Sequence, residues 1–136
     1  MQIGVDASRA VENKRIFVVE PDDVTRAALQ FMLHDENETH EVRDLETAYR
    51  KGQSSRPDLI LLGISIIRDQ GPRVVEEIKR FIPGVKLILV AGPDEAVGFD
   101  PALRVWADDV LLRPLRVETV REKVDLHLGR QRLAAG

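Results

Sequence analysis

Four short apolar runs of the chain end in residues of two kinds, some charged and some without a reactive side chain. RIFVV, DLILL, KLILV and VLL are such runs, and the residues that follow or end them are Glu20, Pro21, Asp22, Gly63, Val90 and Arg113. Carboxylates can bind a divalent cation and a guanidinium can bind an anion. Gly63, however, ends its run without any side chain. The chemistry available there depends on whether these run ends meet in space.

The apolar runs alternate with helical patterns, which places the run ends together. Strands are predicted at 15–19, 40–45, 58–62, 86–90 and 110–112, and helices at 21–33, 45–52, 71–81, 101–106 and 117–133. DLILL is apolar after its first residue, as in a parallel strand covered on both faces. The (βα)₅ order, with right-handed crossovers, predicts one α/β domain with a parallel sheet and helices on both faces. Function in such sheets lies beyond the carboxyl ends of the strands.

Helical periodicity predicts which side chains face the sheet. In the first helix these are Val24, Ala27, Ala28, Phe31 and Met32; in the third, Val74, Val75, Ile78 and Phe81; in the last, Val117, Val120, Val124 and Leu128. Pro101, after the capping side chain of Asp100, suits the first position of a helix that ends near Trp106. The residues between Ala91 and Phe99 are predicted to form a long loop, since glycine and proline are poor in helix interiors.

Composition excludes several classes of protein. The 136 residues include no cysteine, which excludes disulfides, thiolate metal sites and cysteine nucleophiles. The apolar runs fall well short of the ~18 residues that span a bilayer, so we expect a soluble, cytoplasmic protein.

Residues 1–14 are interpreted as an N-terminal leader, 15–133 as the domain and 134–136 as a tail. The last segment is basic from Arg113 onward, but interspersed acids make nucleic-acid binding a lesser alternative.

Four motifs carry a resemblance to a known family. They are IFVVEPDD, RPDLILLGIS with Gly71 eight residues beyond Gly63, VKLILVAG, and ADDVLLRPL. In this order and at these spacings, the chain from about Arg15 to about Leu128 resembles the receiver domain of two-component response regulators. The resemblance implies a flavodoxin-like sheet in the order 2-1-3-4-5 and a phosphoryl-transfer pocket at its carboxyl end.

The resemblance also implies roles that this chain fills only in part. Receiver domains have a phosphoacceptor aspartate where this chain has Gly63, a hydroxyl where it has Val90, and a lysine where it has Arg113. Glu20 keeps the first acidic position, Pro21 takes the second and Asp22 follows. These six residues are interpreted as a degenerate phosphorylation pocket, with no cofactor and no metal beyond weak Mg²⁺ binding at Glu20 and Asp22.

The function expected from this pocket is therefore not enzymatic. The leading hypothesis is a pseudo-receiver that binds a second copy, a histidine kinase or an output protein through its fourth helix, fifth strand and fifth helix. The candidate interface residues are Leu103, Trp106, Val110 and Leu115. Alternatives are an unorthodox phosphoacceptor, a nucleic-acid binder through the last helix and, by fold analogy alone, a flavin site. The resemblance further implies that the Arg113–Pro114 bond is cis, and we predict that Arg113 then pairs with Glu20 or Asp22.

Overall fold

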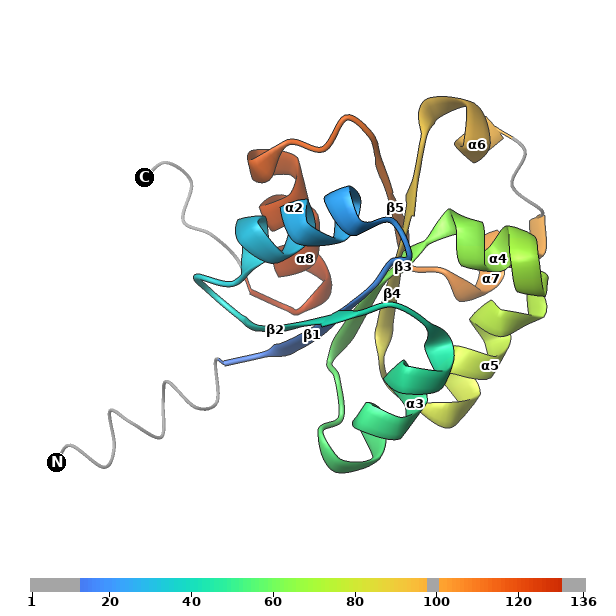
Figure 1. Cartoon of the computed structure of the whole chain (residues 1–136), viewed down its shortest axis with the longest axis horizontal. Helices are drawn as coiled ribbons and strands as arrows, with labels where there is room; N and C mark the ends of the chain where they lie inside the picture. Colours follow the sequence, from blue (N-terminus) through green and yellow to red (C-terminus); the bar gives the residue numbers. More distant parts are fainter. Residues whose placement is uncertain (1–12, 98–100, 131–136) are drawn as a thin grey trace, which may run out of the picture.

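The computed structural model describes residues 13–97 and 101–130, which form a five-stranded parallel sheet between two layers of helices (Figure 1). The strand order is β2-β1-β3-β4-β5, as the sequence predicts. The strands are β1 (Arg15–Val19), β2 (Glu38–Val42), β3 (Leu59–Gly63), β4 (Lys86–Ala91) and β5 (Asp109–Leu112).

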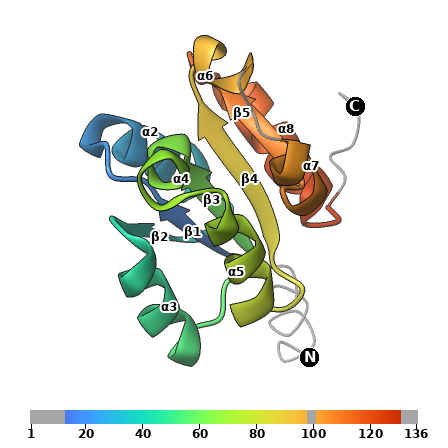
Figure 2. The same cartoon turned by 90° about the vertical axis from the view of Figure 1, so that its right-hand side faces the viewer.

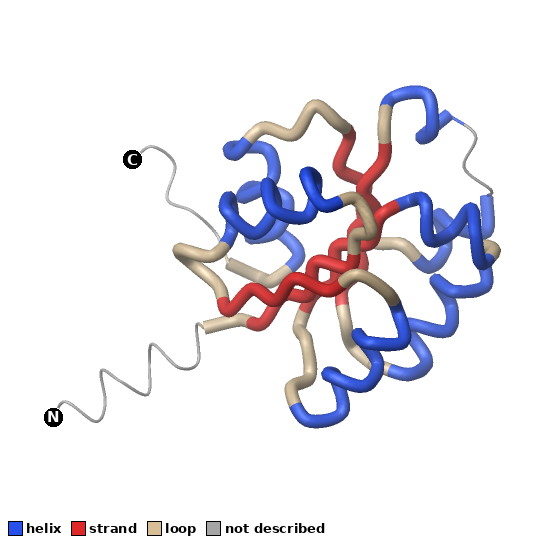
Figure 3. The backbone as a smooth tube through the Cα atoms, in the orientation of Figure 1, coloured by secondary structure: helices blue, strands red, loops and turns tan. Residues whose placement is uncertain are grey.

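The helices divide between the two faces of the sheet (Figures 1 and 3). One face is covered by α2 (Asp23–Leu33) and α8 (Val117–His127). The other is covered by α3 (Leu45–Ser54), α4 (Ile64–Gln70), α5 (Arg73–Phe81) and α7 (Pro101–Trp106). The short α6 (Pro93–Val97) lies beyond the carboxyl end of β4 (Figure 2). No helix in the described ranges has the length and apolar character that a membrane crossing requires.

The central strand β3 shows why the sheet is buried on both sides. All five of its residues are buried. Ile60 and Leu62 join the core under α3 and α5, whereas Leu59 and Leu61 join the core under α2 and α8. Successive side chains of a strand point to opposite faces, so a run without polar residues can exist only between two layers of helices.

The buried face of α2 differs from the predicted one. Val24 and Phe31 are 78% and 73% exposed, while Leu29 and Leu33 are in the core. The reason is Arg26, which is 8% exposed and donates to the carbonyl oxygen of Glu20 over 2.7 Å. A guanidinium anchored beneath the helix fixes its rotation, because a buried charge must keep its partners. Of the stripe predicted to face the sheet, Val24, Ala27 and Phe31 therefore face outward, whereas Ala28 is half-buried and Met32 packs against the core under α2 and α8.

One more side chain and several helix boundaries also differ from the predictions. Phe81 does not face the sheet: it is 68% exposed, and its ring packs against that of Tyr49 with ring centroids 4.8 Å apart. The helix α3 continues past Gly52, and α4 was not predicted. The predicted loop contains α6, whose Glu95 accepts the Gly92 N–H over 2.7 Å.

Two further predictions are confirmed, one made from local chemistry and one implied by the resemblance. The helix Pro101–Trp106 is present, and the Arg113–Pro114 bond is cis. The last helix ends earlier than predicted, at His127, shortly before Gly129 adopts a φ of 74°. That left-handed conformation favours glycine and stops the helix. Residues 98–99 of the predicted loop and 131–133 of the predicted last helix lie outside the described residues.

The orientation of α2 can be tested with two substitutions in the same helix. Leu29→Ala should lower the free energy of unfolding by about 2–5 kcal/mol, because it leaves a cavity in the core. Phe31→Ala should change it by no more than about 0.5 kcal/mol, because the ring is exposed. Urea denaturation of both variants measures the difference, and the opposite ranking would show that the stripe of Phe31 faces the sheet.

Candidate functional site at the carboxyl end of the sheet

Glu20 is the buried acidic residue at the carboxyl end of β1. It is 4% exposed, and its Oε2 accepts the backbone N–H of Asp22 over 2.9 Å. Its own N–H donates to the carbonyl of Val42 over 3.0 Å, which ties the residue to the end of β2. Burial raises the pKa of the Glu20 carboxyl, although the bond from Asp22 and the charges of Arg113 and Arg26 act in the opposite direction.

The Glu20 side chain lies directly over Gly63. A Cβ atom built on Gly63 would overlap Oε1 of Glu20 and stand 2.7 Å from its Cδ. Separations this short do not occur between real atoms, so a side chain at position 63 requires Glu20 to move. The backbone of Gly63, with φ −65° and ψ 134°, is open to any residue type. The backbone conformation therefore does not require the glycine, and a larger residue needs the flexible end of the Glu20 side chain to move.

Arg113 does not make the predicted pair with Glu20 or Asp22. Its Nη2 lies 3.1 Å from Oε1 of Glu95, the same oxygen that accepts the Gly92 N–H. The second oxygen of Glu95 bonds the guanidinium of Arg68 on α4. The turn into α6 brings Glu95 beside Arg113, whereas the Glu20 carboxylate points inward over Gly63. Glu95 thus joins α4, α6 and the end of β5, a role that the sequence did not indicate.

The remaining predicted pocket residues serve the fold. Asp22 accepts the Thr25 N–H over 2.9 Å, which caps α2. Hydrogen bonding with the Thr25 side chain, and then with its backbone, lowers the pKa of the Asp22 carboxyl. Pro21 is exposed at the turn before it. Val90 lies opposite Gly63 in the sheet register, but its side chain belongs to the core under α2 and α8. Of the six predicted residues, Glu20 meets two others through its side chain, since Oε2 accepts the Asp22 N–H and the carboxylate lies over Gly63.

The donor set does not fit a divalent cation. Among the residues that the structure describes, no group of three or more histidine or acidic side chains could hold a metal ion. The Glu20 carboxylate already accepts a backbone N–H, and Asp22 caps a helix. A Mg²⁺ ion prefers near-octahedral oxygen coordination, and the charge of Arg113 would also oppose it.

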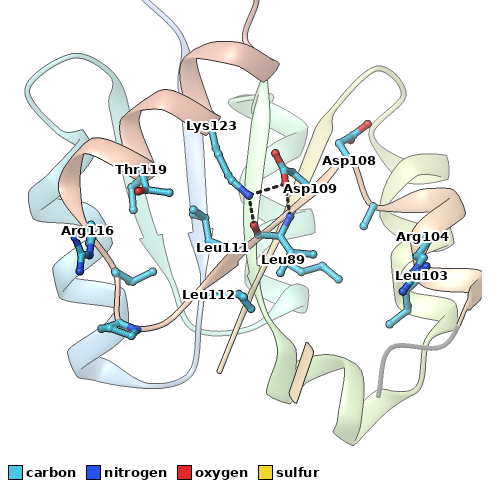
Figure 4. Close-up of a pocket in the computed structure, with 15 residues that line it drawn as sticks. Leu89, Leu103, Arg104, Asp108, Asp109, Leu111, Leu112, Arg116, Thr119 and Lys123 are labelled. Atoms are coloured by element: carbon cyan, nitrogen blue, oxygen red, sulfur yellow. Dashed lines mark hydrogen bonds and ion pairs between the residues drawn. The ribbon is translucent and has the colours of Figure 1, made fainter. Parts of the chain in front are cut away.

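A groove runs along β5 between α7 and α8, with a volume of about 610 Å³ (Figure 4). Its apolar lining includes Leu103, Ala107, Val110, Leu112, Pro114 and Leu115. Three of the four predicted interface residues are therefore together, although Leu103 is only 4% exposed and belongs mainly to the core. Trp106 is 38% exposed and does not line the groove. The sequence missed Leu112, which is 47% exposed within it.

Side chains bond the backbone of β5 within this groove. The Val110 N–H donates to Oδ1 of Asp109 over 2.8 Å, and the Val110 carbonyl accepts from Nζ of Lys123 over 2.7 Å (Figure 4). Lys123 also pairs with Asp109 over 3.0 Å, and His127 lies 2.8 Å from the other Asp109 oxygen. These bonds hold α8 against β5, and those from His127 and Lys123 help to lower the pKa of Asp109 despite its burial.

The sheet order and the position of this pocket define a receiver-type α/β signalling domain. Residues 16–125 match the model of the response regulator receiver domain, and the chain belongs to that family. It is also 27% identical to the alkaline phosphatase synthesis transcriptional regulatory protein PhoP of Bacillus subtilis (strain 168). That match covers 90% of this chain and 52% of PhoP, so the chain spans about half the length of this relative.

Solved structures show the same fold. The N-terminal signal receiver domain of a two-component system response regulator from Bacteroides fragilis superposes with a TM-score of 0.78 at 15% identity, covering 88% of this chain and 99% of that one. A response regulator receiver modulated diguanylate cyclase from Pelobacter carbinolicus gives 0.70 at 24% identity, with 85% and 92% covered. At these identities the likeness establishes the fold alone.

The contact between Glu20 and Gly63 predicts a coupled effect on stability. Gly63→Ala should lower the free energy of unfolding by about 1–3 kcal/mol through overpacking. In a Glu20→Ala background the same change should cost little, because the space is free; the coupling should reach about 0.5–3 kcal/mol. Gly52→Ala is the matched control: its Cβ would meet nothing closer than 3.7 Å, and it should stabilise α3 by about 0.5–1 kcal/mol. Additive costs at positions 20 and 63 would contradict the contact.

The raised pKa of Glu20 predicts a pH-dependent difference between two proteins. Between the unfolded value of about 4.3 and the higher folded value, the folded state binds more protons at Glu20. Protonation of this carboxyl at lower pH therefore raises the free energy of unfolding, and its ionisation at higher pH lowers that free energy. Glu20→Gln should be more stable than the wild type at pH 7, and its advantage should vanish as the pH falls below about 4. Thermal unfolding from pH 3.5 to 7.5 measures this, and a pH-independent difference would contradict it.

Proposed function

We propose that this chain is a receiver-type interaction module that acts without taking up a phosphoryl group. The observation that carries the proposal is the position of the Glu20 carboxylate, whose atoms fill the space where a side chain at Gly63 would begin. A phosphoacceptor needs a nucleophilic side chain with room for an incoming phosphorus atom. At this strand end there is no nucleophile, and the end of the Glu20 side chain takes the space where one would begin.

The surrounding groups support the same conclusion. Val90 offers no hydroxyl, and Arg113 is already bound to Glu95. A phosphoryl group needs hydrogen-bond donors that are free to stabilise its charge. In this chain the donors nearest to the site bond its own carboxylates, and α6 is tied to α4 and β5 by Glu95. We infer a pocket closed by internal ion pairs.

The proposed activity is recognition of another protein in a cytoplasmic two-component pathway. The groove between α7 and α8 supports this, because it exposes apolar surface at Leu112 beside polar walls. The partners considered are a second copy of the chain, a histidine kinase or an output protein. Nucleic-acid binding through α8 is disfavoured, since Arg121 and Lys123 are both engaged, by the Met32 carbonyl and by Asp109.

Incubation with a small phosphodonor tests the proposal. The wild-type protein, incubated with acetyl phosphate and Mg²⁺, should show no phosphoryl adduct by intact mass spectrometry. An authentic receiver domain treated in parallel should gain one phosphoryl group and so verifies the donor. A stable adduct on the wild type, mapped to the carboxyl end of the sheet or to the exposed Asp69 of α4, would overturn the proposal.

A further inference from the structure

The groove between α7 and α8 has an uneven distribution of charge. Its two acidic lining residues are already neutralised: Asp108 pairs with Lys79 over 2.6 Å, and Asp109 with Lys123 and His127. Arg104 and Arg116 line the same groove and are exposed. Within the described part of the chain, neither makes an ion pair or a side-chain hydrogen bond. The surface charge left uncompensated in the groove is therefore positive.

The two arginines stand at opposite sides of the apolar lining. Arg104 projects from α7 beside Leu103, and Arg116 lies before α8, with Leu112 and Leu111 between them in the view of Figure 4. Apolar surface flanked by cationic side chains fits a ligand that has apolar side chains along its middle and carboxylates at its margins. Such complementarity sets the choice and orientation of a partner more than its bare affinity.

The backbone of β5 limits the form that this ligand can take. An extended peptide that added a strand to the sheet would need the free N–H and C=O groups of the edge strand. At Val110 both groups are already bonded, to Asp109 and to Lys123. Side chains that occupy the backbone groups of an edge strand in this way oppose strand addition at that residue. A helix satisfies its own backbone and needs only the apolar floor.

A second copy of the chain fits the groove poorly. In a two-fold dimer the same surface faces itself, so the unpaired charges of both rims would be arginines. Like charges that face each other across an interface disfavour association. An acidic partner would instead compensate both guanidinium groups.

From these observations we infer that the groove binds an acidic amphipathic helix of a partner protein. The helix would place apolar residues at positions i, i+3, i+4 and i+7 over Leu112 and Leu115, with flanking carboxylates directed at Arg104 and Arg116. This inference rests on the proposed interaction function and names the class of ligand for it.

A designed peptide provides the test with the full-length protein. The probe is a fluorescein-labelled synthetic helix with leucine at i, i+3, i+4 and i+7 and glutamate on both flanks. Fluorescence anisotropy should show saturable binding that weakens with added salt. A peptide with lysine in place of glutamate should bind at least about fivefold more weakly, as should a glutamate peptide with a central proline that breaks the helix.

Charge reversal on the protein supplies matched variants. Arg104→Glu and Arg116→Glu should each weaken binding of the glutamate peptide by roughly fivefold, and the double variant by more. Arg73→Glu is the control: Arg73 is also exposed, but it lies on α5 and outside the groove. All three arginines are at the surface, so circular dichroism and thermal unfolding should show unchanged folding. Equal effects from all three substitutions would overturn the inference, as would absence of binding.

Two further outcomes separate this inference from the proposed function. Sedimentation velocity should show a monomer; a wild-type dimer that Leu112→Glu dissociates would assign the groove to a second copy and overturn the inference. If the glutamate peptide fails to bind and acetyl phosphate leaves the mass unchanged, only the helix inference fails. If the protein gains a phosphoryl group, the proposed function fails, whatever the peptide does.

Discussion

One buried carboxylate determines the character of the carboxyl end of the sheet. Glu20 points inward, and its oxygens fill the space that a side chain on Gly63 would need. A carboxylate at 4% exposure loses hydration, and the structure compensates it with a backbone N–H and with the fields of Arg113 and Arg26. The glycine, the buried acid and the neighbouring guanidinium groups therefore meet around one side chain, that of Glu20.

Internal ion pairs take up the groups that could otherwise serve chemistry. Arg26 bonds the carbonyl of Glu20 from beneath and sets the rotation of α2. Glu95 holds Arg68 and Arg113 together above the pocket. Both arrangements consume the positive charge that would stabilise a transferred phosphoryl group. At the β5 edge, Asp109 and Lys123 likewise occupy the backbone groups of Val110. The groove beside them keeps an exposed apolar side chain at Leu112 and two exposed arginines that have no ion pair within the described residues.

The parts of the fold that could be predicted from the sequence depend on local patterns. Buried runs such as that of β3 predicted a covered parallel sheet, and the Asp-Pro pair before Ala102 predicted the start of α7. The incorrect predictions, of the buried face of α2 and of the partner of Arg113, have a different cause. Periodicity counts apolar residues, so it could not anticipate that one buried guanidinium, Arg26, would turn Val24 and Phe31 outward. Pairings between residues far apart in sequence, such as that of Arg113 with Glu95, have no local signal at all.

The character of the pocket depends on where the Glu20 carboxylate lies, and the pKa of that one group reports its position directly. The measurement is an NMR titration of the Glu20 side-chain carboxyl carbon in the wild-type protein, with and without Mg²⁺. A carboxylate buried over Gly63 should titrate above the ordinary value of about 4.3 and should not respond to millimolar Mg²⁺. A pKa at or below the ordinary value, lowered further by Mg²⁺, would show an exposed metal ligand and contradict the account.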